Sequence, residues 1–205
     1  TPVSAEEELA RIEPAVRALR AALDVPISID TFKPVVAARA LELGADIVNC
    51  VWGAPQGITT VAAAARAPIV VMHNRADANY ERDVVAEVIE SLERALEDAL
   101  RSGMPREHLI VDPGIGFGKT AEHNVEILRR LPELRAKLPY PLLIGTSRKS
   151  FIGKVTGLPV EQRAFGTAAS VALSIAGGAD IVRVHDVPEM VAVAKVADAI
   201  SRRNG

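Results

Sequence analysis

The segment from Asp112 to Thr120 has the most unusual composition in the chain and reads Asp-Pro-Gly-Ile-Gly-Phe-Gly-Lys-Thr. A phosphate-binding loop would need a glycine where Pro113 stands, and a dinucleotide fingerprint would need one where Lys119 stands. Neither nucleotide motif is therefore present. The pattern instead indicates a strand that ends in a carboxylate, followed by a glycine-rich loop whose backbone can approach a ligand closely. A merely flexible connection is the alternative.

Two aspartates, Asp30 and Asp112, stand at the ends of different predicted strands. A carboxylate at such a position can accept paired N–H donors or stabilise a developing positive charge. However, Asp30 and Thr31 precede a predicted helix with Pro34 in its first turn, so either side chain could simply cap that helix. Both interpretations of Asp30 stay open at this point.

Cationic side chains gather after the last two predicted strands, at Arg148, Lys149, Arg183 and His185. Loops at these positions of a barrel commonly bind phosphate groups, so the cluster favours an anionic substrate or leaving group. A solvated charge pair is the alternative for Arg148 and Lys149, and a packed core histidine is the alternative for His185. Arg183 is harder to explain structurally, because it falls within an apolar strand. His73 has no ligand partner at metal-binding spacing.

The elements that must position these residues are short apolar strands alternating with helical patterns, which favours parallel pairing with both sheet faces covered. Six strands are predicted, within residues 25–30, 46–51, 68–73, 108–112, 141–146 and 180–185. The sequence Gly-Ala-Asp-Ile-Val occurs twice, at 44–48 and 178–182, so two units should enter the sheet in the same way.

Each predicted strand ends in polar residues, which favours a closed barrel over an open sheet with one ligand-binding crevice. We therefore predict the α/β class and a (β/α)8 TIM barrel, of which six parallel strands are present. The first two strands are predicted to be absent from this chain, whose start resembles a cut within a domain. An open six-stranded sheet is the alternative.

The composition indicates a single globular domain over residues 1–205, with 49% hydrophobic and 24% charged residues. A net charge of -2 and scattered aromatic residues argue against a nucleic-acid partner. The one cysteine, Cys50, excludes an internal disulfide, and there is neither a signal-peptide pattern nor an apolar run of about 20 residues. We expect a cytoplasmic location without membrane partners.

The ordered motifs of the chain resemble those of the dihydropteroate synthase family over its whole length. They are Ser28-Ile29-Asp30-Thr31, Val48-Asn49, Met72-His73, Asp112 to Lys119, Ser147-Arg148-Lys149-Ser150 and Arg183-Val184-His185-Asp186. The resemblance implies a folate-pathway transferase that condenses 6-hydroxymethyl-7,8-dihydropterin pyrophosphate with p-aminobenzoate to 7,8-dihydropteroate and pyrophosphate. It also implies Mg²⁺ as cofactor, a homodimer through the helices at 164–176 and 187–201, and membership of a class of enzymes that sulfonamides target.

The pterin-binding roles carried over by this resemblance fall on four residues. Asp112 would pair with the guanidine-like edge of the pterin, and Asn49 with ring nitrogens. Lys149 would contact the ring carbonyl and the N5 region, while Met72 would pack against the ring.

The roles at the reacting centre fall on five others. Asp30 would stabilise the dihydropterin as its bond to pyrophosphate breaks. Arg183 and His185 would hold the pyrophosphate, and Ser147 and Phe117 would border the aminobenzoate. The residues expected to act in catalysis are thus Asp30, Lys149, Arg183 and His185, and no metal ligand is expected in this chain.

Two departures from the family pattern leave alternatives open. Cys50 follows Asn49 where the family often has aspartate, and the family's opening strand and Ser-Thr-Arg-Pro-Gly loop would precede Thr1. Pterin binding with severely impaired turnover is therefore expected of these 205 residues taken alone. One alternative function is a catalytically silent pterin-binding paralogue or interaction subunit, and another is a methyltetrahydrofolate-dependent corrinoid methyltransferase. The cationic cluster argues against the latter.

Overall fold

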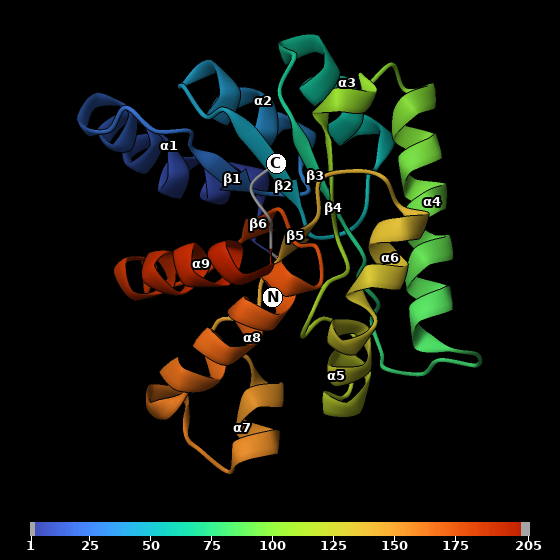
Figure 1. The fold of residues 1–205 in the computed structure, drawn as a ribbon. Helices are drawn as coiled ribbons and strands as arrows, with labels where there is room; N and C mark the ends of the chain where they lie inside the picture. The colour runs from blue at the N-terminus through green and yellow to red at the C-terminus, as the bar shows by residue number, and fades with distance from the viewer. Residues whose placement is uncertain (1–2, 202–205) are drawn as a thin grey trace. The chain divides into compact units, whose positions relative to one another are not determined.

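The computed structural model describes residues 3–201, so the ends of the predicted domain 1–205 lie outside the described residues. In chain order the elements are α1 (Ala5–Ala22), β1 (Ser28–Asp30), α2 (Pro34–Glu42), β2 (Ile47–Cys50), α3 (Gln56–Ala65), β3 (Ile69–Met72), α4 (Val84–Arg101), β4 (Leu109–Asp112), α5 (Ala121–Arg129), α6 (Leu131–Lys137), β5 (Leu143–Ile144), α7 (Ser150–Thr156), α8 (Ala164–Ala176), β6 (Ile181–Val182) and α9 (Val187–Ser201), with 3-10 turns at Arg106–His108 and Val160–Gln162. Each of the six strands lies within its predicted range (Figure 1).

The chain divides into two compact units, the first comprising residues up to Met72 together with Leu92–Ile110. The first unit holds β1, β2 and β3, of which β1–β2 and β2–β3 pair in parallel. The apolar residues of β2 and β3, such as Val48 and Ile69, are fully buried, as expected of strands covered on both faces. The register places Asp30 opposite Asn49.

The end of β1 is tied to the first turn of α1. Ser4 begins this helix as its N-cap and accepts the N–H of Glu7 at 3.1 Å. Glu8 accepts a hydrogen bond from the Thr31 hydroxyl at 2.6 Å and forms an ion pair with Lys33. The residue that caps α2 is Lys33, without a side-chain cap bond, so the interpretation of Asp30 as a helix cap is wrong.

The second unit comprises His73–Ser91 and the residues from Val111 onward. Strands β5 and β6 pair in parallel, and a parallel bridge joins Val111 to Leu142. The helices α8 and α9 lie side by side (Figure 1), around a core that contains Val171 and Met190. The backbone N–H of His73 donates to the carbonyl of Asp112 at 2.9 Å, and that of Arg183 donates to Ile144 at 3.0 Å. These ladder bonds align the strand ends that carry the polar residues.

The predicted repeat has the same geometry in both copies. Gly44 and Gly178 have φ values of +104° and +102°, which glycine adopts without a steric penalty. The aspartates that follow act alike, because Asp46 accepts the N–H of Ile27 at 2.7 Å and Asp180 accepts that of Leu142 at 2.8 Å. Five identical residues thus direct two helices into parallel strands. Within residues 3–201, no helix combines the length and apolar character needed to cross a bilayer.

Candidate functional site

In the first unit, the paired strands β1 and β2 bring two predicted site residues together. The side-chain amide of Asn49 donates a hydrogen bond to the carboxylate of Asp30. Asn49 is buried, whereas Asp30 is exposed, so the carboxylate can face a ligand. Met72, the last residue of β3, is buried. A polar pair and an apolar side chain therefore lie at or next to the ends of three parallel strands, as the sequence predicted.

In the second unit, Asp112 is a buried carboxylate at the end of β4, with 7% of its surface exposed. Its Oδ1 accepts the N–H of Gly114 at 2.7 Å. Burial raises its pKa, and the Gly114 N–H together with the charges of Lys149, Lys119 and Arg183 opposes that rise. A desolvated carboxylate among cations is costly to fold, so the arrangement favours a binding role for Asp112 over a purely structural one.

The glycines of the loop after β4 allow close backbone contacts. Gly114, Gly116 and Gly118 all have positive φ, at +70°, +84° and +54°. A Cβ added to Gly114 would overlap the carbonyl oxygen of His73, and one added to Gly116 would lie 2.9 Å from the Cδ of Lys149. Because L-residues rarely adopt these angles and no space is available, the loop requires glycine here.

We therefore expect Gly114→Ala to lower the free energy of unfolding by about 3 kcal/mol or more, through both backbone strain and overlap. Gly103→Ala is the matched control, because Gly103 also has positive φ, at +88°, but no atom lies within 4 Å of the added Cβ. That variant should lose only about 1 kcal/mol. Urea unfolding of both variants measures the difference, and equal losses would contradict the close contact with His73.

Lys149 reaches from the start of α7 to the same loop. Its ammonium donates to the carbonyl of Ile115 and lies 4.7 Å from the centre of the Phe117 ring. Burial lowers the pKa of Lys149, Asp112 opposes that effect, and Arg183 adds to it. The interpretation of Lys149 as part of a solvated charge pair is therefore wrong, because its ammonium lies between a carbonyl and an aromatic face.

The residues after β5 and β6 form a second polar group. The Oγ of Ser147 lies 2.8 Å from the Nδ1 of His185 and accepts the backbone N–H of that residue at 3.2 Å. His185 and Arg183 are exposed, so neither is a packed core residue, and Arg183 follows β6 instead of lying within it. Arg148 donates to both oxygens of Asp186, so its charge is already paired within the protein.

The pair formed by His73 and Lys119 was not among the site residues predicted from the sequence. The Nδ1 of His73 lies 2.8 Å from the Nζ of Lys119, and His73 is only 4% exposed. Burial lowers the pKa of His73 to about 3, with Lys119 and Arg75 contributing, so the ring is neutral at pH 7. The lysine that ends the glycine-rich loop was the available signal, but its partner is distant in sequence.

A metal site does not emerge from the described residues. Among residues 3–201, no three His, Cys, Asp or Glu side chains lie together in a way that could hold a metal ion. Mg²⁺ prefers several oxygen ligands in octahedral geometry and commonly takes some of them from substrate phosphates. The side chains described here therefore do not fit a resident Mg²⁺ site on their own.

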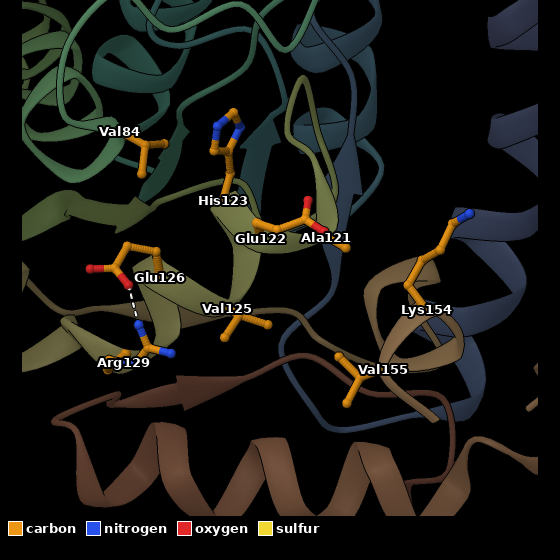
Figure 2. Close-up of a pocket in the computed structure, with 9 residues that line it drawn as sticks. All are labelled: Val84, Ala121, Glu122, His123, Val125, Glu126, Arg129, Lys154 and Val155. Atoms are coloured by element: carbon orange, nitrogen blue, oxygen red, sulfur yellow. Dashed lines mark hydrogen bonds and ion pairs between the residues drawn. The ribbon is translucent and has the colours of Figure 1, made fainter. Parts of the chain in front are cut away.

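The pocket shown in Figure 2 lies apart from the predicted site residues, with a volume of about 410 Å³. It is lined by α5 and α7, including Glu122, His123 and Lys154, and an ion pair joins Glu126 to Arg129 within it (Figure 2). Its mixed charges and exposed position do not resemble a concave ligand site with converging polar groups. We assign it no role in the chemistry.

Comparison with known proteins agrees with this geometry. Residues 1–185 match the family described as pterin binding enzyme. The chain is 43% identical to the dihydropteroate synthase of Bacillus subtilis, over 99% of this chain and 71% of the relative, and 48% identical to that of Synechocystis sp., over 98% and 72%.

Solved structures give the same result. A dihydropteroate synthase from Clostridium difficile, in the presence of pteroic acid, is 44% identical with a TM-score of 0.95, over 99% of this chain and 78% of that one. The enzyme from Xanthomonas albilineans with 4-aminobenzoic acid is 40% identical with a TM-score of 0.94, over 100% and 75%.

Proposed function

The chain belongs to the family of pterin binding enzymes and, within it, to the dihydropteroate synthases, and we propose that its strand-end residues bind the two substrates. This transferase joins p-aminobenzoate to 6-hydroxymethyl-7,8-dihydropterin pyrophosphate, and it produces 7,8-dihydropteroate and pyrophosphate in folate biosynthesis. The parallel α/β fold of barrel type predicted from the sequence is that of the solved relatives, so the fold class is confirmed.

Pterin recognition is assigned to Asp112, Lys149, Asn49 and Met72, the residues on which the family resemblance places it. A carboxylate accepts two parallel N–H bonds from a guanidine-like edge, and an ammonium donates to a ring carbonyl. The burial of Asp112 supports this assignment, because such bonds are stronger where water is excluded. Met72 supplies an apolar surface for a flat ring.

Pyrophosphate binding is assigned to Arg183 and His185. Both are exposed in the segment that follows β6, and the Ser147 hydroxyl lies 2.8 Å from the His185 ring and holds its orientation. An arginine fork and an imidazole N–H can both donate to phosphate oxygens. Because the two side chains are exposed, the protein folds without having to bury them. An arginine charge beside a histidine donor suits a leaving group that gains negative charge as it departs.

The bond changes need little acid–base chemistry from the protein. The C–O bond to pyrophosphate breaks with its electron pair going to oxygen, the neutral amine of p-aminobenzoate forms the new C–N bond, and the amine then loses a proton to solvent. The dihydropterin carbon gains positive charge in the transition state, which the carboxylate of Asp30 would stabilise. Phe117 and Ser147 would hold the aminobenzoate in position.

The observation that carries these assignments is the burial of the Asp112 carboxylate. Its negative charge is stabilised by the positive charges of Lys119, Lys149 and Arg183. The test uses the protein as its gene encodes it, measuring pyrophosphate release with each substrate present or omitted. Release that requires both substrates and yields 7,8-dihydropteroate supports the function. Pterin binding by calorimetry without any release would instead favour the catalytically silent paralogue.

Mg²⁺ is proposed to arrive bound to the pyrophosphate group of the substrate. Its role would be to offset negative charge on the phosphate oxygens, which is the usual use of Mg²⁺ with such substrates. No step is assigned to it through a residue of this chain. Cytoplasmic location and inhibition by sulfonamides are also proposals, the latter supported by a Yersinia pestis dihydropteroate synthase solved in a sulfonamide drug complex.

A homodimer through α8 and α9 is proposed on the apolar side chains that these helices leave exposed. Phe165 and Leu173 on α8 are 90% and 71% exposed, and Ile200 on α9 is 81% exposed. Large apolar patches on a protein surface commonly mark an interface. We expect Leu173→Glu to convert the dimer to a monomer in analytical ultracentrifugation, while exposed Glu93→Gln on α4 should not. A parent protein that sediments as a monomer would contradict the proposal.

A further inference from the structure

Lys119 makes three polar contacts from within the glycine-rich loop. Its Nζ donates to the carbonyls of Gly114 and Phe117, each at 3.0 Å, and lies 2.8 Å from the Nδ1 of His73. An ammonium group carries three donors, so these three partners match its full capacity. A lysine held in this way connects two segments of the second unit and two ends of one turn.

The turn that Lys119 spans has a defined geometry. The N–H of Phe117 donates to the carbonyl of Gly114 at 3.1 Å, closing a four-residue turn. Its third residue, Gly116, has a φ of +84°, the positive value that a type II turn requires there. Lys119 therefore binds the carbonyls of the first and last residues of the turn and holds them against the His73 ring.

The opposite side of the same turn contacts Lys149. The carbonyl of Ile115 accepts a hydrogen bond from the Lys149 ammonium, and the Phe117 ring lies 4.7 Å from that ammonium. A displacement of the turn would therefore shift the Phe117 ring relative to the Lys149 ammonium. The N–H of Gly116 donates separately to the Oδ1 of Asn124, at 2.6 Å. On the side of the turn near His73, the hydrogen bonds come from Lys119.

The position of Lys119 is costly for a cation, which argues against an incidental role. Burial lowers its pKa to about 7, and the carboxylate of Asp112 opposes that effect. Both charge states can keep the contacts, because a neutral amine can donate to the two carbonyls and accept the N–H of the His73 ring. The three contacts consequently do not depend on one protonation state.

We propose that Lys119 is a positioning residue that fixes the turn from Gly114 to Phe117 and thereby sets the Phe117 ring for p-aminobenzoate. The link to p-aminobenzoate rests on the role proposed above for Phe117. Lys119 is not proposed to touch either substrate. Its loss should therefore impair the second substrate and leave pterin binding largely unchanged.

The decisive variant is Lys119→Met, which keeps the length and apolar stem of the side chain but has no donor. Three quantities are measured, namely the KM for p-aminobenzoate, the Kd for the pterin, and backbone amide hydrogen exchange of residues 114–118. We expect the KM to rise about tenfold or more, the exchange to accelerate about tenfold, and the Kd to change less than about threefold. Lys154→Met on α7, where the lysine is exposed, is the control and should change none of them.

Lys119→Gln provides a second variant, since its amide keeps two donors without the charge. It should fall between the parent and Lys119→Met in exchange rate and in KM. Unchanged exchange and KM in Lys119→Met would overturn the proposal, as would a parallel rise in KM and pterin Kd, or failure of both variants to fold. Because exchange is measured without substrates, it tests the turn even if the parent protein releases no pyrophosphate and the proposed function itself fails.

Discussion

Asp112→Asn should lower kcat/KM for the pterin substrate at least about a hundredfold. Asparagine has nearly the same shape as aspartate, but it offers one oxygen acceptor and one NH₂ donor where the pterin edge presents two donors. A buried donor placed against a donor leaves both groups without a partner, which costs several kcal/mol. The bond from the Gly114 N–H, now 2.7 Å long, can be kept by the remaining oxygen.

Stability measurements separate this effect from misfolding. The folded-state pKa of Asp112 is raised, so its ionised form disfavours folding above the ordinary aspartate pKa, and this cost grows as the pH rises through the shifted value. Removing that charge should therefore not lower the free energy of unfolding at pH 7 by more than about 1 kcal/mol. Asp24→Asn, at an exposed position, is the control for loss of one negative charge. Pterin affinity that is unchanged in Asp112→Asn would refute the recognition role.

Asp30→Asn should reduce kcat about a hundredfold, with less than about a threefold change in pterin Kd. The carboxylate is expected to act on positive charge that develops only as the C–O bond breaks, so its loss should be felt in the transition state and hardly in the ground state. Asn49, which donates to Asp30, can still donate to the amide oxygen of the substituted residue. The neighbouring pterin contact is thereby preserved.

Single-turnover measurements of pyrophosphate release check this result, because they isolate bond breaking from product release. The same Asp24→Asn variant serves as the control. A variant with weaker pterin binding and an unchanged single-turnover rate would place Asp30 in recognition and not at the reacting centre. An equal loss of pterin affinity and of the single-turnover rate would instead indicate that Asp30 and Asn49 act together as one binding unit.

Several features of the site could be predicted from the sequence because they depend on local order along the chain. Apolar runs of strand length placed Asp30, Asn49 and Asp112 at strand ends, and alternation of side chains along a strand needs no knowledge of distant residues. Glycines at alternate positions predicted a loop that allows close approach of the backbone. The order of the motifs along the chain also indicated the family, because each motif follows a particular strand and the strands have a fixed order in the sequence.

Other features were decided by tertiary structure, because their partners are far apart in sequence. Arg148 appeared to be free to bind an anion, but Asp186 lies 38 positions away and binds it. His73 and Lys119 are 46 positions apart, and each has an ordinary local context. Strand order brings such loops together, and burial then shifts the pKa of their side chains, as it lowers that of Lys119 to about 7. The sequence by itself determined which side chains end the strands, whereas only packing decided which of them pair, which stay exposed and which lose water, because pairing and desolvation depend on distance in space.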